Sequence, residues 1–342
     1  MSVPLRFAAA LLAALLAIAP AVARTATDSA GRRVEIPDHI TRVFAAGPPA
    51  AVLLYALAPQ DMIGWVEAPS DAAKAYLLPA VRDLRELGRL TGKGGKPDLD
   101  KLKAAHPDLI IDFGTIAESY KTLADQVQTE THIPYLLIDG SLQNTPAALR
   151  LVGDLLGVKD RGEALAQAAE TQLAAVDQVL AKVPAAQRPR IYLARRADGL
   201  QSGAKGSITN EIITRAGGIE VVPDLPGKGG LVVATTKDIA QWTPDTIVTL
   251  ERDFAEKSAT APDWQSVPAV AQHRVFVAPS QPFGFIDEPP SINRLIGLAW
   301  LMHRLYPDQT AGDLKQQVRD FYRLFYQADL GDADLDRLLG TP

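Results

Sequence analysis

Residues 161–183 read RGEALAQAAETQLAAVDQVLAKV. After Gly162 the segment has no Gly or Pro until Pro184, and it is rich in Ala, Leu, Glu and Gln, which favour a helix. Apolar residues recur at steps of three and four, which gives such a helix one apolar face: Leu165, Ala169, Leu173, Val176 and Leu180. About 20 helical residues span about 30 Å, roughly the width of a small domain. We therefore predict one stiff helix between two globular halves; an ordinary helix inside one large domain is the alternative.

On both sides of this segment, short apolar runs alternate with longer amphipathic stretches. The candidate strands are residues 42–45, 62–66, 109–113 and 135–139 before the helix, and 190–194, 219–222, 246–250 and 274–278 after it. Strands separated by helices imply parallel sheets built from βα units. We predict an α/β fold with two Rossmann-like lobes, mostly parallel sheets and one joining helix. The expected bounds are 24–158 for the first lobe, 159–184 for the helix and 185–342 for the second lobe.

A weak internal repeat supports two lobes of one plan. Residues 102–110 read LKAAHPDLI and residues 239–247 read IAQWTPDTI. In each, a short helix ends at Pro-Asp, because proline lacks an N–H and restricts the residue before it. A buried strand is expected to follow at the corresponding place in each half.

Composition excludes several classes of protein. The 342 residues are 47% hydrophobic and 22% charged, the balance of a folded chain. A net charge of -5 argues against a nucleic-acid binder, which needs a basic face. The absence of cysteine excludes disulfides, thiolate metal sites, a cysteine nucleophile and a lipid anchor on cysteine. The histidines are scattered without metal-ligand spacing, so we expect no metal site and no cofactor: His39, His106, His132, His273 and His303.

The first 23 residues have the pattern of a secretory signal peptide. Arg6 precedes an apolar run over residues 7–19, and Ala21-Val22-Ala23 is a small-x-small cleavage site. The run is too short to span a bilayer comfortably, so an uncleaved membrane anchor is the weaker interpretation. We expect a mature protein free in a Gram-negative periplasm.

Six motifs, in this order, carry a family resemblance. They are TDSAGRRV at 27–34, ITRVFAAG at 40–47, PDLI at 107–110, NEIITRAGG at 210–218, WQSV at 264–267 and DEPPSINRLIGLAWL at 287–301. Together they resemble the periplasmic substrate-binding proteins of ABC importers in the class with a single interlobe helix. The resemblance implies a monomeric receptor that grips a small molecule in an interlobe cleft and delivers it to a permease. The favoured cargo is a ferric-siderophore-type iron chelate; molybdate or tungstate, haem and cobalamin are the alternatives.

The loops after the predicted strands are expected to hold this cargo, because open α/β sheets bind ligands at their carboxyl ends. Arginine forks suit carboxylate, catecholate or oxyanion groups, and aromatic rings supply an apolar wall. The candidate ligand contacts are Trp65, Tyr76, Arg195, Arg196, Arg252, Phe283 and Phe285. Core packing is the alternative for Trp65, a half-buried helix position is the alternative for Tyr76, and surface ion pairs are the alternative for the arginines.

Receptors of the resembled family dock to the permease with one acidic residue on each lobe. By this resemblance the residue of the first lobe is Asp100, seven positions before the Pro-Asp element. The matching position in the second lobe is Lys237, so the sequence departs from the pattern. Neighbouring Asp238 or Glu211 is expected to take over that contact.

A secreted hydrolase is the main alternative from another class. Glu251 and Asp287 would then be paired carboxylates for acid–base chemistry. The sequence has neither a G-x-S-x-G nor an HExxH motif, so we predict a protein that is not an enzyme.

Overall fold

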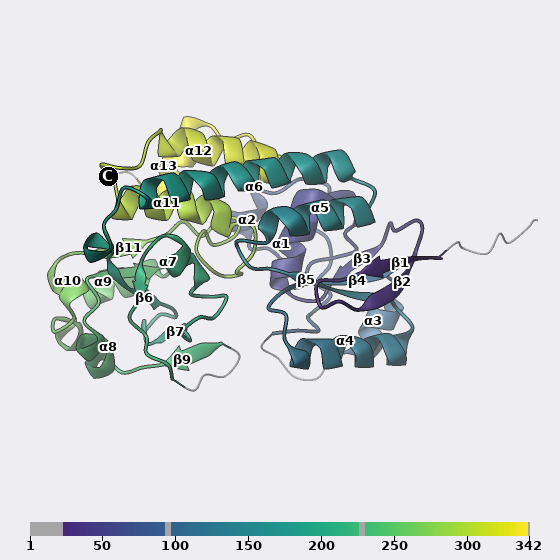
Figure 1. Cartoon of the computed structure of the whole chain (residues 1–342), viewed down its shortest axis with the longest axis horizontal. Coiled ribbons are helices and arrows are strands. Elements are labelled where there is room, and N and C mark those ends of the chain that lie inside the picture. The colour runs from purple at the N-terminus through teal and green to yellow at the C-terminus, as the bar shows by residue number, and fades with distance from the viewer. Residues whose placement is uncertain (1–22, 93–96, 226–229, 341–342) are drawn as a thin grey trace, which may run out of the picture.

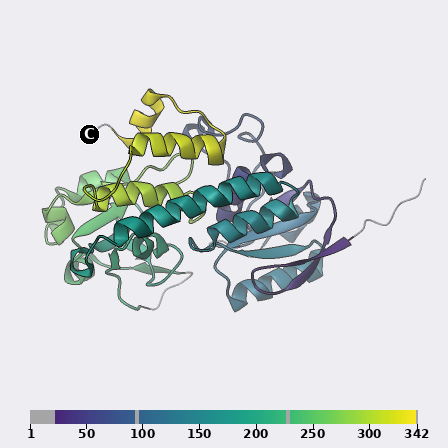
Figure 2. The same cartoon turned by 45° about the horizontal axis from the view of Figure 1, so that its top comes forward.

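The computed structural model describes residues 23–92, 97–225 and 230–340. It has the predicted α/β fold, with two sheet-containing halves side by side and one long helix, α6 (Lys159–Leu180), lying across both (Figures 1 and 2). The predicted signal peptide lies outside the described residues except for Ala23, which begins the first strand. Within the described parts of the chain, no helix is both long and apolar enough to cross a bilayer.

The first half contains a parallel sheet of three strands in the order β3-β4-β5. Its strands are β3 (Val43–Ala45), β4 (Leu109–Gly114) and β5 (Tyr135–Asp139), preceded by an antiparallel pair, β1 (Ala23–Thr27) and β2 (Arg33–Pro37). Its helices are α1 (Pro48–Leu57), α2 (Asp71–Lys74), α3 (Leu99–Ala104), α4 (Glu118–Thr131) and α5 (Thr145–Leu155). The strand predicted at 62–66 is wrong, because this segment makes only isolated bridges from Met62 to Val43 and from Trp65 to Glu86.

The second half contains a parallel sheet of four strands in the order β11-β10-β6-β8. These strands are β6 (Arg190–Ala194), β8 (Ile219–Glu220), β10 (Thr246–Thr249) and β11 (Val275–Val277); β7 (Gln201–Gly203) and β9 (Leu231–Val233) form a separate antiparallel pair. The helices are α7 (Glu211–Arg215), α8 (Thr236–Trp242), α9 (Arg252–Ser258), α10 (Pro268–Ala271), α11 (Arg294–Leu305), α12 (Leu314–Phe321) and α13 (Asp332–Leu339). Both sheets are parallel, as the alternation of strands and helices predicted.

The Pro-Asp repeat has the same structure in both halves. Asp108 accepts hydrogen bonds from the backbone N–H of Thr41 and Arg42, at 2.9 and 3.0 Å. Asp245 accepts one from the backbone N–H of Arg190 at 3.0 Å. In each half the aspartate follows a helix and ties its end to the first strand of a parallel sheet, which confirms that the repeat is structural.

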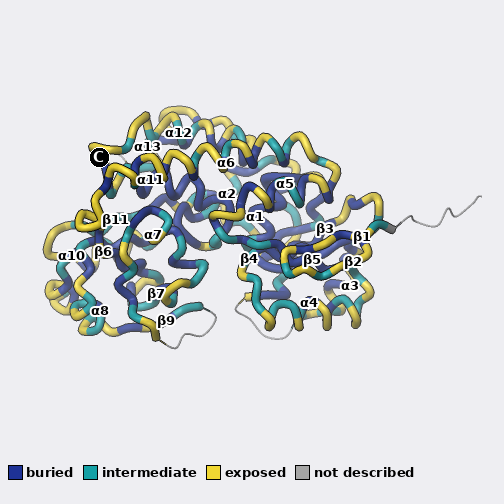
Figure 3. Tube along the Cα trace, viewed as in Figure 1, coloured by how far each residue is buried: buried dark blue, intermediate teal, exposed yellow. Residues whose placement is uncertain are grey.

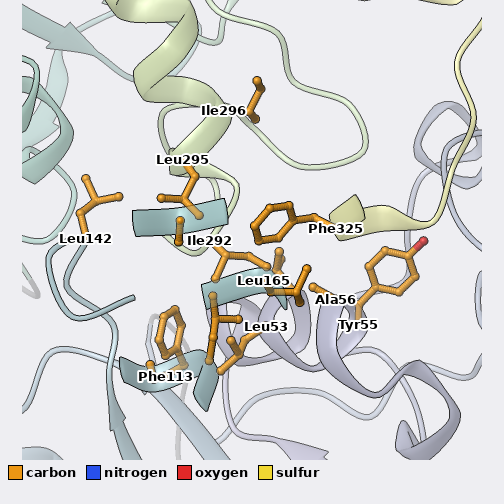
Figure 4. Packing of buried hydrophobic residues seen from close by; sticks show 14 of the residues in the cluster. Leu53, Tyr55, Ala56, Phe113, Leu142, Leu165, Ile292, Leu295, Ile296 and Phe325 are labelled. Atoms are coloured by element: carbon orange, nitrogen blue, oxygen red, sulfur yellow. The ribbon is translucent and has the colours of Figure 1, made fainter. Parts of the chain in front are cut away.

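A continuous apolar core joins the two halves. The predicted apolar face of α6 is buried at Leu165, Ala169, Leu173 and Val176, while its opposite face is exposed (Figure 3). Residues of α1, α6 and α11 meet in one cluster (Figure 4). The halves are therefore held by a packed interface as well as by the helix.

Candidate ligand-binding site

A pocket of about 300 Å³ lies between the two halves, at the carboxyl ends of β10 and β11. The first half supplies α2 and Tyr76, and the second half supplies the strand ends and the last turn of α13. Its lining residues are Ala72, Ala75, Tyr76, Leu250, Arg252, Val277, Ala278, Pro279, Ser280, Gln281, Arg337, Leu338 and Leu339. Its position agrees with the general rule that open α/β sheets bind ligands at their strand ends.

Two guanidinium groups and one phenol face this pocket. Arg252 is the exposed first residue of α9, in the turn that follows the end of β10 at Thr249. Arg337, from α13, has only a loose ion pair with Asp334, at 3.5 Å, and its side chain is 68% exposed. The ring of Tyr76 packs edge-on against Tyr322, with centroids 6.0 Å apart. Two guanidinium forks beside a packed phenol suit an anionic molecule with several oxygen atoms.

Much of the remaining lining is apolar. Leu250 and Val277 come from the strand ends, and Leu338 and Leu339 come from α13. A ligand that fills this space therefore meets hydrocarbon on several sides and positive charge at two points. Small-molecule sites commonly combine an apolar wall with a few placed polar groups.

Arg195 lies at the end of β6 and is held within its own half. Its guanidinium contacts Asp287 at 2.6 Å, Glu288 at 3.1 Å and the side-chain oxygen of Gln201 at 2.8 Å. The Arg195 side chain is 12% exposed and that of Asp287 is 2% exposed, so this is a largely buried ion pair. Burial raises the pKa of Glu288, and the nearby Arg195 opposes that rise. The alternative of an ion pair is thus present for Arg195, although the pair is largely buried and not at the surface.

Arg196 differs from its neighbour. Its backbone has a φ of 72° and its side chain is exposed. Within the described part of the chain, that side chain makes no hydrogen bond or ion pair. It is available to a ligand, although it does not line the 300 Å³ pocket.

The predicted aromatic residues form a cluster between the halves. Trp65 is 3% exposed and donates its indole N–H to the carbonyl of Val81 at 2.8 Å. The ring of Phe283 packs against those of Trp65 and Tyr326, with centroids 6.2 and 5.5 Å away, respectively. Phe285 is fully buried. These contacts are internal, so a role for Trp65, Phe283 and Phe285 in binding stays a prediction.

Of the predicted ligand contacts, Tyr76 and Arg252 line this pocket; its other polar lining residues, Arg337, Ser280 and Gln281, were not among the predicted contacts. Arg337 is 85 positions after Arg252 in a C-terminal helix of ordinary amphipathic pattern. In the sequence, only its positive charge could have pointed to Arg337, and many other residues share that charge. Only the folding of α13 back onto the strand ends brings it to the site.

The predicted docking acids have different environments. Asp100 is exposed in the first turn of α3. Asp238 caps α8 by accepting from the backbone N–H of Thr235 at 2.9 Å, and its hydrogen bonds with Thr235 lower its pKa. Glu211 is engaged at the contact between the halves, where it pairs with Arg294 at 2.8 Å. Permease docking by any of the three stays a prediction.

Metal-binding side chains do not gather in the described residues. Within 23–92, 97–225 and 230–340, no group of three or more His, Cys, Asp or Glu could hold a metal ion.

Comparisons with known proteins agree with this architecture. A family model described as periplasmic binding protein matches residues 53–282. An ABC transporter solute-binding protein from Sulfurospirillum deleyianum is 27% identical, with a TM-score of 0.85 and coverage of 93% of this chain and 99% of that one. No curated protein sequence matches the chain.

Two more distant structures share the fold. The molybdate periplasmic binding protein MolA of Haemophilus influenzae, solved with molybdate, is 22% identical, with a TM-score of 0.72 and coverage of 90% and 99%. CeuE of Helicobacter pylori, solved in a nickel–histidine complex, is 14% identical, with a TM-score of 0.71 and coverage of 94% and 100%. At these identities the likeness concerns the fold alone.

Proposed function

Because the chain belongs to the periplasmic binding protein family, the solute-binding proteins of ABC transporters, we propose that its solute is an anionic iron chelate of the ferric-siderophore type. The chelate occupies the pocket between the halves and is passed to the permease of the importer. The protein makes and breaks no bond in this cycle.

One observation carries the proposal: Tyr76, Arg252 and Arg337 line one pocket although they come from distant parts of the chain. A chelate with carboxylate or catecholate oxygens would accept hydrogen bonds from both guanidinium groups and from the phenol. Since Tyr76 belongs to the first half and both arginines to the second, such a ligand would bridge the halves.

The size and lining of the pocket favour an organic chelate over a bare oxyanion. Its volume of about 300 Å³ is near the lower end of the range for drug-sized ligands. A tetrahedral oxyanion such as molybdate gains most from a tight shell of donors, and apolar residues such as Leu250, Val277 and Leu339 offer none. Molybdate therefore serves as the competing ligand in the test, together with haem and cobalamin.

The carboxylates near the strand ends support a receptor over a hydrolase. Asp287, which the hydrolase hypothesis would pair with Glu251, is buried and bonded to Arg195. A general base needs access to the proton that it removes. The ion pair instead gives this carboxylate a structural task.

Isothermal titration of the purified protein tests the cargo, with ferric tris-catecholate, ferric citrate, molybdate, haem and cobalamin as separate ligands. We expect a ferric chelate to bind best. Arg252→Ala should weaken that binding about 10- to 100-fold, the usual effect of losing a hydrogen bond to a charged group. Arg33→Ala, at an exposed position of β2, is the matched loss of charge and should leave affinity unchanged.

Tight binding of molybdate with no binding of the chelates would replace the proposed cargo with the oxyanion. Equal affinity of Arg252→Ala and the unaltered protein for the best ligand would remove the pocket from the proposal. Native mass spectrometry of protein purified from its own periplasm would identify the cargo independently through the mass that copurifies.

A further inference from the structure

A buried arginine that does not line the pocket connects the two halves. Arg294 is the first residue of α11, and its side chain is fully buried. It donates to the carbonyl of Gly140 at 2.7 Å, to Glu211 at 2.8 Å and to the carbonyl of Ile208 at 2.9 Å. Gly140 follows β5 in the first half, whereas Glu211 begins α7 in the second. One guanidinium thus spans the boundary between the halves.

Glu211 spans the same boundary in the opposite direction. One of its carboxylate oxygens accepts from Arg294, and the other accepts from the backbone N–H of Leu142 at 2.9 Å. Gly140 and Leu142 are two residues apart in the turn between β5 and α5. The ion pair therefore binds both a carbonyl and an N–H of a single turn, which fixes the orientation of that turn as well as its distance.

The surroundings of the pair are tightly packed. Gly140 donates its N–H to the carbonyl of Gly114 at 2.8 Å, and a Cβ at position 140 would lie 2.7 Å from the Cα of Gly114. Leu142, Ile292 and Leu295 belong to the same buried cluster around the start of α11 (Figure 4). Little free space remains for the turn to shift while the hydrogen bonds persist.

The local helix does not explain an arginine at this position. A cation at a helix N-terminus faces the positive end of the helix dipole, which is unfavourable. Burial adds a second cost, and it lowers the pKa of Arg294 while Glu211 opposes that change. An apolar side chain at this position would avoid the desolvation cost of a buried charge. Apolar contacts have no fixed direction, however, so the two halves could slide against each other. A directional network accounts for the charge at this point of the interface.

A second contact lies three residues before Arg294. The hydroxyl of Ser291 donates to the carbonyl of Pro49, in the first turn of α1, at 2.7 Å. The start of α11 is therefore bonded to two separate segments of the first half. The pocket side also has contacts between the halves, such as the ring of Tyr76 against that of Tyr322, but these are apolar packing contacts without a fixed direction.

We propose that Arg294 and Glu211 are positioning residues that form a fixed pivot between the halves, which sets their relative orientation. The pair holds the turn after β5 against the starts of α7 and α11. This inference concerns the geometry of the protein itself and does not depend on which solute it carries.

The distance between the halves is the direct readout. Because the chain has no cysteine, Lys103→Cys in α3 and Gln272→Cys after α10 provide unique, exposed sites for spin labels. Double electron–electron resonance on the ligand-free protein should give one narrow distance distribution. Glu211→Ala should broaden it at least twofold. Arg294→Lys should broaden it less, since an ammonium group keeps the charge but lacks the planar fork.

Asp177→Ala is the matched control. Arg215 is in α7, like Glu211, and pairs at 2.8 Å with Asp177 of α6. This pair joins α7 to α6 and does not involve the turn after β5. Its distance distribution should equal that of the labelled parent protein. Circular dichroism would confirm that each variant is folded, and Glu211→Gln, which keeps the shape and one acceptor, replaces Glu211→Ala if the latter is unfolded.

A lower melting temperature with an unchanged distribution in a folded Glu211 variant would assign the pair to stability alone and overturn the pivot. Broadening in Asp177→Ala to the same extent would do so as well. Because no cargo is present in this experiment, failure of the proposed iron-chelate binding would leave its result unaffected.

Discussion

Arg42 and Arg190 do the same work in the two halves of the molecule. Arg42 directly precedes β3 and donates to two carbonyls at the end of α3, at 2.7 and 2.8 Å. Arg190 begins β6 and donates to two carbonyls at the end of α8, at 2.7 and 3.1 Å. Each arginine closes the last turn of the helix whose Pro-Asp sequence leads into the next strand. The two halves thus share side-chain chemistry as well as topology.

This equivalence predicts similar losses on mutation. Arg42→Ala and Arg190→Ala should each lower the free energy of unfolding by about 1 kcal/mol. In each variant, carbonyl groups at the end of a helix lose their guanidinium donor and must accept hydrogen bonds from water instead. Urea denaturation would measure both, and affinity for cargo should not change. A loss confined to one of the two variants would contradict the equivalence.

Arg195→Ala should act on stability and leave the pocket lining in place. The substitution leaves Asp287, whose side chain is 2% exposed, without its cation. Breaking a buried pair in this way costs about 3 kcal/mol. Arg196→Ala, the adjacent exposed arginine, is the natural control and should unfold at the same denaturant concentration as the unaltered protein. If Arg195→Ala were as stable as Arg196→Ala, the ion pair would contribute nothing to the fold.

Features set by local sequence were predictable. The long helix follows from a Gly- and Pro-free segment with one apolar face, and the end of α3 follows from proline. The strand expected at 62–66 failed because its apolar residues pack in the core without strand neighbours along their length: Met62 and Trp65 make single bridges only. A run of apolar residues indicates that a segment is buried. To form a strand, the segment must also pair with a neighbouring strand along its length.

The candidate site was predictable only where it depends on strand order. Arg252 comes soon after β10, so its place near the carboxyl edge of the sheet could be inferred. The acidic partner of Arg195 is 92 residues away in sequence, and Arg337 comes from a helix that folds back from the C-terminal region. Contacts between residues that are distant in sequence leave no periodic pattern. The internal ion pair of Arg195 and the position of Arg337 at the pocket were therefore not predicted.

Asp112 predicts a pH dependence of stability. This residue of β4 is 8% exposed, and burial raises its pKa from 3.8 to about 6, against hydrogen bonds from Tyr135 at 3.2 Å and Thr91 at 3.3 Å. A carboxyl group with a raised folded-state pKa favours the folded state while protonated. Its contribution is therefore fully present below about pH 4, declines as the pH rises towards 6 and stays low above it.

Asp112→Asn should remove this dependence, because the amide stays neutral at every pH. We expect the variant to be more stable than the parent by about 1–2 kcal/mol at pH 8 and nearly equal to it at pH 4. Denaturation series at both pH values would measure the difference. Equal stability at pH 8 would mean that the folded carboxylate is not destabilised by its burial.

Tyr76→Phe separates two roles for the pocket phenol. The ring packs against Tyr322 and the residue is 7% exposed, so phenylalanine keeps the packing and removes only the hydroxyl. We expect the hydroxyl to donate a hydrogen bond to the chelate, so its loss should weaken binding about 5- to 10-fold, as for a typical hydrogen bond. The visible absorption of the bound ferric chelate should not change, because the iron keeps all its ligands. Loss of a charge-transfer band in Tyr76→Phe, but not in the control Tyr120→Phe on α4, would instead show that the phenolate binds the iron directly. Unchanged affinity of Tyr76→Phe for the chelate would place Tyr76 outside the site.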